Sequence, residues 1–240
     1  MLVEFPERPG AGPHAVGLAR LVQSTPRTSD RGLIVAVIAA RNEHDCIGQA
    51  IRSLDEQSSR PDLTIVCAYE CLDRTALAVE AEGADAFVAT DPEHGRAGAL
   101  NDVLDLLLPQ LRDDDAVLIM DAESFPGSQF VAAARRRLTE GVGGAGVFIG
   151  LEGGGFVELF QGSDYGPFVR DLVRAREEEL VLIGSAALYS VETLWHVVTA
   201  RSAGLLPTGG SQVYNAEAPD EDAELALTLV YLGYKVVAVP

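Results

Sequence analysis

The chain has 240 residues, of which 48% are hydrophobic and 22% charged, and this composition is that of a globular protein rather than a disordered one. Thirty-six acidic residues against eighteen basic ones give a net charge of −18. That charge argues against a nucleic-acid partner, because nucleic-acid affinity comes largely from Lys and Arg that neutralise phosphates. The length is sufficient for one large domain with a substantial core.

The cysteines and the apolar runs indicate the cellular compartment. The chain has three cysteines, with no Cys-x-x-Cys pair and no Cys/His ligand set, so neither a disulfide framework nor a zinc site is predicted and a cytoplasmic location is the simplest expectation. The N-terminal stretch lacks the basic start and long apolar core of a secretory signal. No run approaches the roughly 18 apolar residues that a transmembrane segment requires, so none is expected.

Residues 1–30 are rich in Pro, Gly and Ser, and they predict an N-terminal extension that lies over the domain or is partly flexible. Strands and helices then alternate from residue 31 onward. Short apolar runs predict strands at 33–40, 63–69, 85–90 and 116–122, and the intervening segments predict helices within 41–57, 73–84 and 95–111. This alternation favours a mostly parallel sheet with helices on both faces.

The second half is less regular. Helices are predicted within 127–141, 164–181, 191–200 and 219–233, and strands at 145–151, 181–190 and 234–240. The last helix is the best marked, since it opens with Pro219 and acidic residues and stops at Gly233. Residues 31–240 are therefore expected to form a single α/β domain.

Several common catalytic motifs are absent or misplaced. "GVGGAG" at 141–146 matches the dinucleotide pattern G-x-G-x-x-G, but it follows a helix and precedes a strand, so we interpret it as a flexible turn. The chain has no phosphate-loop motif, no H-E-x-x-H and no G-x-S-x-G around Ser185. ATP, zinc-protease and serine-nucleophile chemistry therefore receive no support.

Polar side chains gather where the predicted strands end, at 41–43, at 91–96 and at Asp121 with Glu123. In open parallel α/β sheets, ligands bind beyond the carboxyl ends of the strands. Asp121 and Glu123 are two residues apart, so in an extended segment their carboxylates project to the same side and could hold Mg²⁺ or Mn²⁺. Taken alone, the pair is better explained as a solvated loop, because acidic residues after a strand are common in loops.

The order of the motifs adds a family resemblance. "VAVIAARNEHDCIGQAIRSL", "IVCAYECLDRT", "GRAGALN", "VLIMDAES", "IGSAALYS" and "DEDAELALTLVYLGYKVVAVP" follow one another as in the family-2 glycosyltransferases. The resemblance covers about residues 33–240 and looks closest to the branch of cellulose, hyaluronan and poly-N-acetylglucosamine synthases, but without membrane helices. It implies a GT-A-like, Rossmann-type catalytic domain at 31–240, an inverting mechanism and a divalent metal, Mn²⁺ or Mg²⁺.

The resemblance also implies roles for individual positions. Donor nucleotide-sugar binding would involve Ala39, Ala40, Arg41, Glu43, Ala68, Asp73, Arg96, Asp121, Gly184, Ser185 and Glu221. Arg96 would lie near the donor diphosphate, Asp121 near the ribose and the metal, and Glu123 would be the principal metal ligand. Asp222 would be the general base.

Physical chemistry supports a base at this position independently. Transfer by direct displacement needs a cation at the leaving diphosphate and a carboxylate that removes the acceptor's proton. It needs no second nucleophilic carboxylate. Asp220 or Asp222 could instead cap the last helix, since acids at a helix N-terminus are stabilising, and both roles can coexist in neighbouring acids.

The chain departs from the family pattern in four places. The family's Asp-Asp-Gly-Ser reads Ala68, Tyr69, Glu70 and Cys71, so the base-contacting aspartate is missing. Asp-x-Asp has become Asp-x-Glu, and a lysine has become Arg96, whose fork suits phosphate. The sequence ends without a Gln-x-x-Arg-Trp motif, which argues against a processive synthase.

The sequence therefore predicts a metal-dependent inverting glycosyltransferase of the hexosyltransferase type, with a UDP-sugar as the expected donor. The acceptor class is left open between a glycan, a lipid, a small molecule and a protein. Two alternatives stay open: a sugar nucleotidyltransferase, which would be expected to carry a Gly-rich loop near the first strand, and a non-catalytic nucleotide-sugar binding domain.

Overall fold

The computed structural model describes residues 2–3, 13–27, 31–90, 95–148 and 183–239, and the elements named below belong to these ranges. The strands are β1 Leu2–Val3, β2 Ile34–Ala40, β3 Leu63–Tyr69, β4 Ala86–Thr90, β5 Ala116–Asp121, β6 Val142–Phe148, β7 Ile183–Ser190 and β8 Lys235–Ala238. The helices are α1 Pro13–Ser24, α2 Ile47–Asp55, α3 Thr75–Glu82, α4 Gly95–Leu107, α5 Phe130–Arg137, α8 Val191–Ser202 and α9 Glu221–Tyr231, with a short 3₁₀ helix at Leu108–Gln110.

The strands form one mostly parallel sheet in the order β1-β4-β3-β2-β5-β7-β6-β8. Strand β7 is antiparallel to both of its neighbours, β5 and β6, whereas the other pairings are parallel. In the register of the central strands, Ala39 lies beside Asp121, and Ala40 lies beside Ala68. The carboxyl ends of β2, β3 and β5 therefore meet at one edge of the sheet, where ligands bind in such folds.

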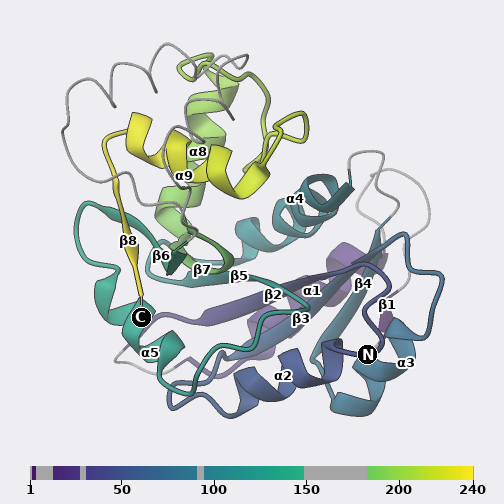
Figure 1. Cartoon of the computed structure of the whole chain (residues 1–240). Coiled ribbons are helices and arrows are strands. Elements are labelled where there is room, and N and C mark those ends of the chain that lie inside the picture. The colour runs from purple at the N-terminus through teal and green to yellow at the C-terminus, as the bar shows by residue number, and fades with distance from the viewer. Residues whose placement is uncertain (1, 4–12, 28–30, 91–94, 149–182, 240) are drawn as a thin grey trace.

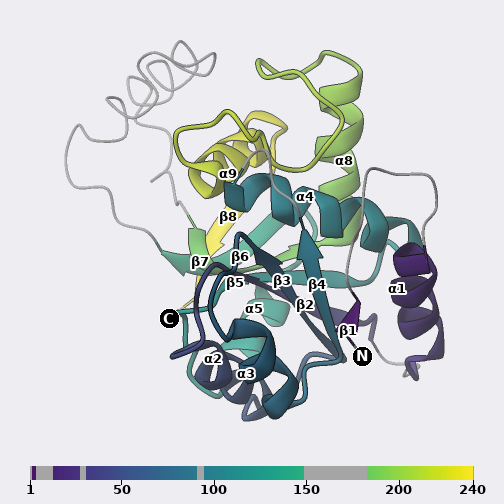
Figure 2. The same cartoon turned by 90° about the vertical axis from the view of Figure 1, so that its right-hand side faces the viewer.

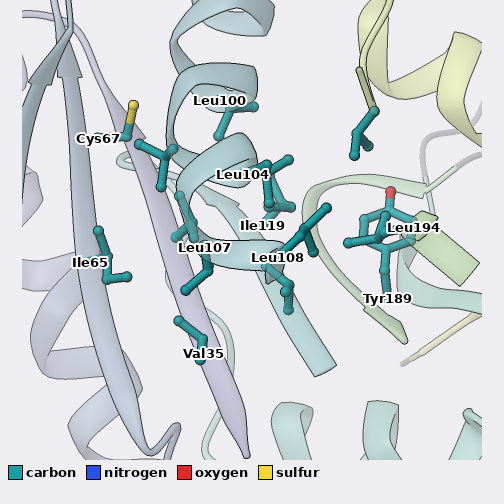
Figure 3. Packing of buried hydrophobic residues seen from close by; sticks show 14 of the residues in the cluster. Val35, Ile65, Cys67, Leu100, Leu104, Leu107, Leu108, Ile119, Tyr189 and Leu194 are labelled. Atoms are coloured by element: carbon teal, nitrogen blue, oxygen red, sulfur yellow. The ribbon is translucent and has the colours of Figure 1, made fainter. Parts of the chain in front are cut away.

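Helices cover both faces of the sheet, as the alternating pattern predicted (Figures 1 and 2). Helices α2, α3 and α5 pack on one face, and α1, α4, α8 and α9 on the other. Figure 3 shows the core between the sheet and the helices α1, α4, α8 and α9, where Val35 and Ile65 of the strands face Leu104 and Leu107 of α4. Successive strand residues point to opposite faces, so a continuous apolar run such as 34–40 supplies both cores.

Most predicted elements are confirmed. The strand predicted at 63–69 has those bounds in the structure, and α3 ends at Gly83, whose φ of 78° closes the helix in the left-handed conformation. The predicted helix at 164–181 lies outside the described residues. The sequence pattern predicts no helix before residue 33, yet α1 is present and buries Leu18 and Val22 against the core. Its apolar stripe is too short to stand out among Gly and Pro.

The interpretation of "GVGGAG" as a flexible turn is wrong, because Val142–Phe148 is strand β6, paired with both β7 and β8. Its glycines reflect close packing rather than flexibility. A Cβ on Gly144 would lie 2.9 Å from the Tyr189 ring, and a Cβ on Gly146 would lie 2.6 Å from the carbonyl oxygen of Ala186.

Substitution Gly146→Ala is expected to lower the free energy of unfolding by about 1–3 kcal/mol, because the new methyl group meets fixed backbone rather than a movable side chain. Urea unfolding followed by circular dichroism measures the change. Gly127→Ala is the matched control, since a Cβ there has no neighbour within 4 Å. Equal stability of the two variants would contradict the close-packing explanation.

Candidate active site

A pocket of about 390 Å³ opens at the sheet edge where β2, β3 and β5 end. It is bounded on the opposite side by the start of α9. The lining residues are Ala39, Arg41, Glu43, Tyr69, Arg96, Asp121, Ala122, Glu123, Pro219, Asp220, Glu221 and Asp222. Six of these carry carboxylates and only two, Arg41 and Arg96, carry a guanidinium, so the pocket is strongly acidic.

The loops that follow β2 and β3 are joined to each other beside the pocket. Arg41 forms an ion pair with Glu70 at 2.7 Å, and the backbone N–H of Leu72 donates to Oδ1 of Asn42 at 2.7 Å. Asn42 and Glu70 have positive φ angles of 59° and 48°, which are unfavourable for residues with a Cβ. Such strain is retained where the surrounding contacts impose it, and it is concentrated at functional sites.

Asp73 links the same two loops through hydrogen bonds. Its carboxylate accepts hydrogen bonds from the backbone N–H groups of Thr75 at 3.0 Å and of His44 at 3.1 Å. The Thr75 hydroxyl in turn accepts from the N–H of Glu43 at 2.8 Å. Asp73 thereby holds the segment that presents Arg41 and Glu43, and it is not itself among the residues that line the pocket.

Asp121 and Glu123 lie where β5 ends, and both line the pocket. Asp121 is the last residue of the strand and lies beside Ala39 of β2. Its side chain is 38% exposed. Glu123 lies in the turn after the strand, where the N–H of Ser124 donates to the carbonyl oxygen of Asp121 at 3.1 Å. The two acids therefore share the pocket, but not through the extended spacing that the sequence predicted.

The guanidinium of Arg96, from the first turn of α4, lies between the acidic residues of two elements. Its Nη2 is 2.7 Å from Asp121 Oδ1, and its Nη1 is 2.9 Å from Glu221 Oε1 and 3.2 Å from Asp222 Oδ2. Burial opposes its charge, but the neighbouring carboxylates, Asp222 foremost, outweigh burial and hold the pKa of Arg96 well above its ordinary value. Arg96 is therefore a permanent cation in the pocket.

The acids at the start of α9 divide the two predicted roles. Asp220 is the N-cap, since its Oδ1 accepts from the N–H of Ala223 at 2.9 Å. Asp222 faces the pocket, and its side chain is only 15% exposed. The pKa of Asp222 is raised from 3.8 to about 6, chiefly by burial; Arg96 opposes the shift, and Asp121 and Glu221 add to it. One acid caps the helix and the other is available to the site.

A buried ion pair connects α9 to α8. Arg201 of α8 lies 2.7 Å from Glu224 Oε2, and both side chains are almost wholly buried. The hydroxyl of Thr208 donates to the other oxygen of Glu224 at 3.1 Å. The network links α8, the loop that precedes α9 and α9 itself. It therefore fixes the helical turn that carries Asp222.

No protein-family model and no curated protein matches the chain. Solved structures do match. Glucosyl-3-phosphoglycerate synthase from Mycobacterium tuberculosis, in complex with Mn²⁺, UDP and phosphoglyceric acid, aligns with a TM-score of 0.57 at 20% identity, over 98% of this chain and 75% of that one. The mannosyltransferase PcManGT from Pyrobaculum calidifontis, in complex with GDP-Man and Mn²⁺, aligns with a TM-score of 0.59 at 16% identity, over 92% of this chain and 60% of that one. The fold is the GT-A glycosyltransferase fold.

The GT-A fold brings most of the predicted site residues together. Eight line the pocket: Ala39, Arg41, Glu43, Arg96, Asp121, Glu123, Glu221 and Asp222. Ala40 and Ala68 are buried behind it, and Gly184 and Ser185 begin β7, whose start lies beside the end of β5. Lining the pocket does not establish a role, so the part that any of these residues, or Asp73, plays in donor or metal binding stays a prediction.

The pocket also contains residues that the sequence patterns did not single out as ligands. Tyr69 is the last residue of β3, Ala122 follows β5 directly, and Pro219 and Asp220 precede α9. Tyr69 and Ala122 are adjacent in sequence to the predicted residues Ala68 and Asp121, so the strand-end rule could have included them. Tyr69, which is half-buried, supplies the aromatic ring of the pocket.

The carboxylate oxygens of this pocket suit a hard divalent cation that is also coordinated by phosphate oxygens of a substrate. Among the described residues, no group of three or more His, Cys, Asp or Glu side chains is arranged to hold a metal. Asp121 and Glu123 would supply two ligands, and Mg²⁺-type ions are commonly bound by one or two carboxylates together with water and substrate phosphates.

In the part of the chain that the structure describes, no helix has the length and apolarity needed to cross a bilayer.

Proposed function

We propose that the chain is a metal-dependent family-2 glycosyltransferase of the hexosyltransferase type, which transfers a sugar from a nucleotide-sugar donor, a UDP-sugar, to an acceptor hydroxyl with inversion. The observation that carries the proposal is the pocket itself. At the carboxyl ends of the parallel strands, one partly buried arginine, Arg96, is surrounded by carboxylates from β5 and α9. Glycosyltransferases of this fold with UDP or GDP-Man and Mn²⁺ bound support the same reading.

The donor is assigned to the sheet side of the pocket. Tyr69 and Arg41, at the ends of β3 and β2, would contact the nucleoside, and Arg96 would donate to the diphosphate. Asp121 and Glu123 would hold the metal. When bound, Mn²⁺ or Mg²⁺ supplies positive charge that stabilises the leaving nucleoside diphosphate.

The acceptor is assigned to the α9 side. Asp222 would accept the proton of the acceptor hydroxyl while that oxygen attacks the anomeric carbon. A base whose pKa lies near the working pH combines the ionised form with sufficient basicity, and burial raises the pKa of Asp222 to about 6. One direct displacement inverts the anomeric carbon, so no covalent sugar–enzyme intermediate is required.

A sugar nucleotidyltransferase is the weaker alternative. Such an enzyme would be expected to hold the triphosphate in a Gly-rich loop after the first strand of the sheet core. Here the segment after β2 reads Arg41-Asn42-Glu43, and it is tied to the next loop by side chains. Only an assay of turnover distinguishes the proposed enzyme from a non-catalytic nucleotide-sugar binding domain.

The test is a thermal-shift panel of nucleotide sugars with and without Mn²⁺, followed by assays for free nucleoside diphosphate with glycan, lipid, small-molecule and protein acceptors. We expect a UDP-sugar to raise the Tm only when Mn²⁺ is present, and proton NMR of the product to show an inverted anomeric configuration. If the protein binds the donor but releases no nucleoside diphosphate with any of these acceptors, it is a non-catalytic binding domain and the enzyme proposal is wrong. Retention of configuration would remove Asp222 as the general base of a direct displacement.

A further inference from the structure

Arg96 contacts the same carboxylate that the proposed metal requires. Its Nη2 lies 2.7 Å from Asp121 Oδ1, and its other amino group contacts Glu221 and Asp222. The guanidinium is thus the internal cation for three carboxylates. Its Nε is buried and has no hydrogen-bond partner among the described residues, which leaves one donor unused. An unused buried donor in a pocket is the feature expected where a ligand oxygen completes the set.

A divalent ion on Asp121 would face this guanidinium at close range. If the ion displaced Arg96 from Asp121, the ion pair would be lost. If the ion took the second oxygen of Asp121, two cations would share one carboxylate and repel each other in a partly dehydrated site. In both arrangements, Arg96 lowers the affinity of the pocket for a metal that arrives alone.

When a diphosphate is bound, the effect of Arg96 on metal binding changes from unfavourable to favourable. Its oxygens can coordinate the metal on one side and accept from the fork of Arg96 on the other. The anion then lies between two cations, and the unused Nε–H gains an acceptor. Metal and diphosphate therefore stabilise each other through Arg96, and such a coupling acts equally on both affinities.

From this geometry we infer that Arg96 acts as a placeholder cation, which keeps Asp121 neutralised and makes the pocket take the divalent metal and the nucleoside diphosphate together rather than separately. Arg96 is a positioning residue in this role, because it acts through Asp121 and the diphosphate. The inference rests on the proposed function. It adds that binding of metal alone is suppressed by a residue of the chain itself.

The experiment measures Mn²⁺ binding directly, from the paramagnetic resonance signal of the free ion. Mn²⁺ is titrated alone and then with saturating UDP, with GDP as a second probe. For the unsubstituted protein we expect weak binding of Mn²⁺ alone and much tighter binding with the diphosphate. Arg96→Met is expected to tighten the binding of Mn²⁺ alone on the order of 10-fold and to reduce the enhancement by UDP.

Arg41→Met is the matched control, because Arg41 lines the same pocket but pairs with Glu70, which is not a candidate ligand. It should leave the affinity for Mn²⁺ alone unchanged. In the double variant Arg96→Met, Asp121→Asn, the affinity for Mn²⁺ alone should no longer be increased, because the effect of Arg96 acts through Asp121. If Arg96→Met does not fold, Arg96→Gln decides, since its neutral amide still donates a hydrogen bond to a carboxylate but carries no charge, and it should also tighten Mn²⁺.

The outcomes separate this inference from the proposed function. If the unsubstituted protein binds Mn²⁺ with UDP or GDP, but the Arg96 variants leave the affinity for Mn²⁺ alone unchanged or lower, only the placeholder role is overturned. If the unsubstituted protein binds Mn²⁺ with neither nucleotide, the proposed function and the inference fail together. A gain for Mn²⁺ alone in the Arg96 variants, absent in Arg41→Met, supports the inference.

Discussion

Asp222→Asn is expected to lower kcat by about 10²- to 10⁴-fold, while the affinity for the nucleotide sugar stays nearly unchanged. The amide keeps the shape of the side chain but cannot accept the acceptor's proton. Arg96 retains Asp121 and Glu221 as partners, so the diphosphate side of the pocket is preserved. The measurements are steady-state release of nucleoside diphosphate and the Kd of the donor with Mn²⁺.

Asp220→Asn is the matched control for this variant. Asp220 lines the same pocket two residues earlier, but its carboxylate caps α9, and asparagine is an equally good N-cap. Activity and stability should therefore change little. If Asp222→Asn retained the full kcat, or if Asp220→Asn lost as much activity, Asp222 would not be the base.

The pKa of Asp222 predicts two pH effects. Turnover should fall as the pH is lowered through about 6, since the protonated carboxyl cannot act as a base. Stability should change in the opposite direction. Because burial raises the pKa of this group from 3.8 to about 6, the folded protein binds the proton more tightly than the unfolded chain does, and ionisation destabilises the fold as the pH rises through this window.

Asp222→Asn cannot ionise at this position, so the metal-free variant should be more stable than the unsubstituted protein at pH 7, by at most about 3 kcal/mol. The difference should shrink toward pH 4. Denaturant unfolding at both pH values measures it. A variant that is less stable at pH 7 would show that the contact with Arg96 outweighs the burial of the charge.

The second large effect is expected at the metal. Glu123→Ala, or EDTA added to the unsubstituted protein, should abolish detectable turnover and greatly weaken donor binding, because the leaving diphosphate then loses the cation that stabilises it in an acidic pocket. Isothermal titration with a UDP-sugar, with and without Mn²⁺, measures the binding term separately from catalysis.

Glu123→Asp serves as the conservative control, since it restores the carboxylate found at this position in the resembled family. It should keep Mn²⁺-dependent binding, with a shift in affinity that reflects the shorter side chain. Donor binding that is insensitive to EDTA and unchanged in Glu123→Ala would remove the metal assignment, whatever the activity.

The sequence alone determined the alternation of strands and helices, because a strand buried on both faces must be apolar throughout and each helix must have an apolar stripe. It also placed Asp121, Glu123 and Asp222 at element ends, where polar groups are tolerated. It did not identify α1, and it predicted β6 only from residue 145 onward rather than from Val142. The glycines of β6 have the appearance of a turn, and only their contacts with Tyr189 and Ala186 show why a side chain is excluded.

The tertiary structure decided which acids share a site and what each one does. The sequence left both Asp220 and Asp222 open as the cap of the last helix. Only the structure shows that Asp220 caps α9 while Asp222 contacts Arg96 in the pocket. The same holds for Arg96, which lies more than a hundred residues from Glu221 and Asp222 in the chain. Sequence spacing predicts neighbours within one helix or strand, but the distance between charges from different elements depends on how the sheet and helices pack. That packing sets the pKa of Asp222 and the position of Arg96 beside Asp121.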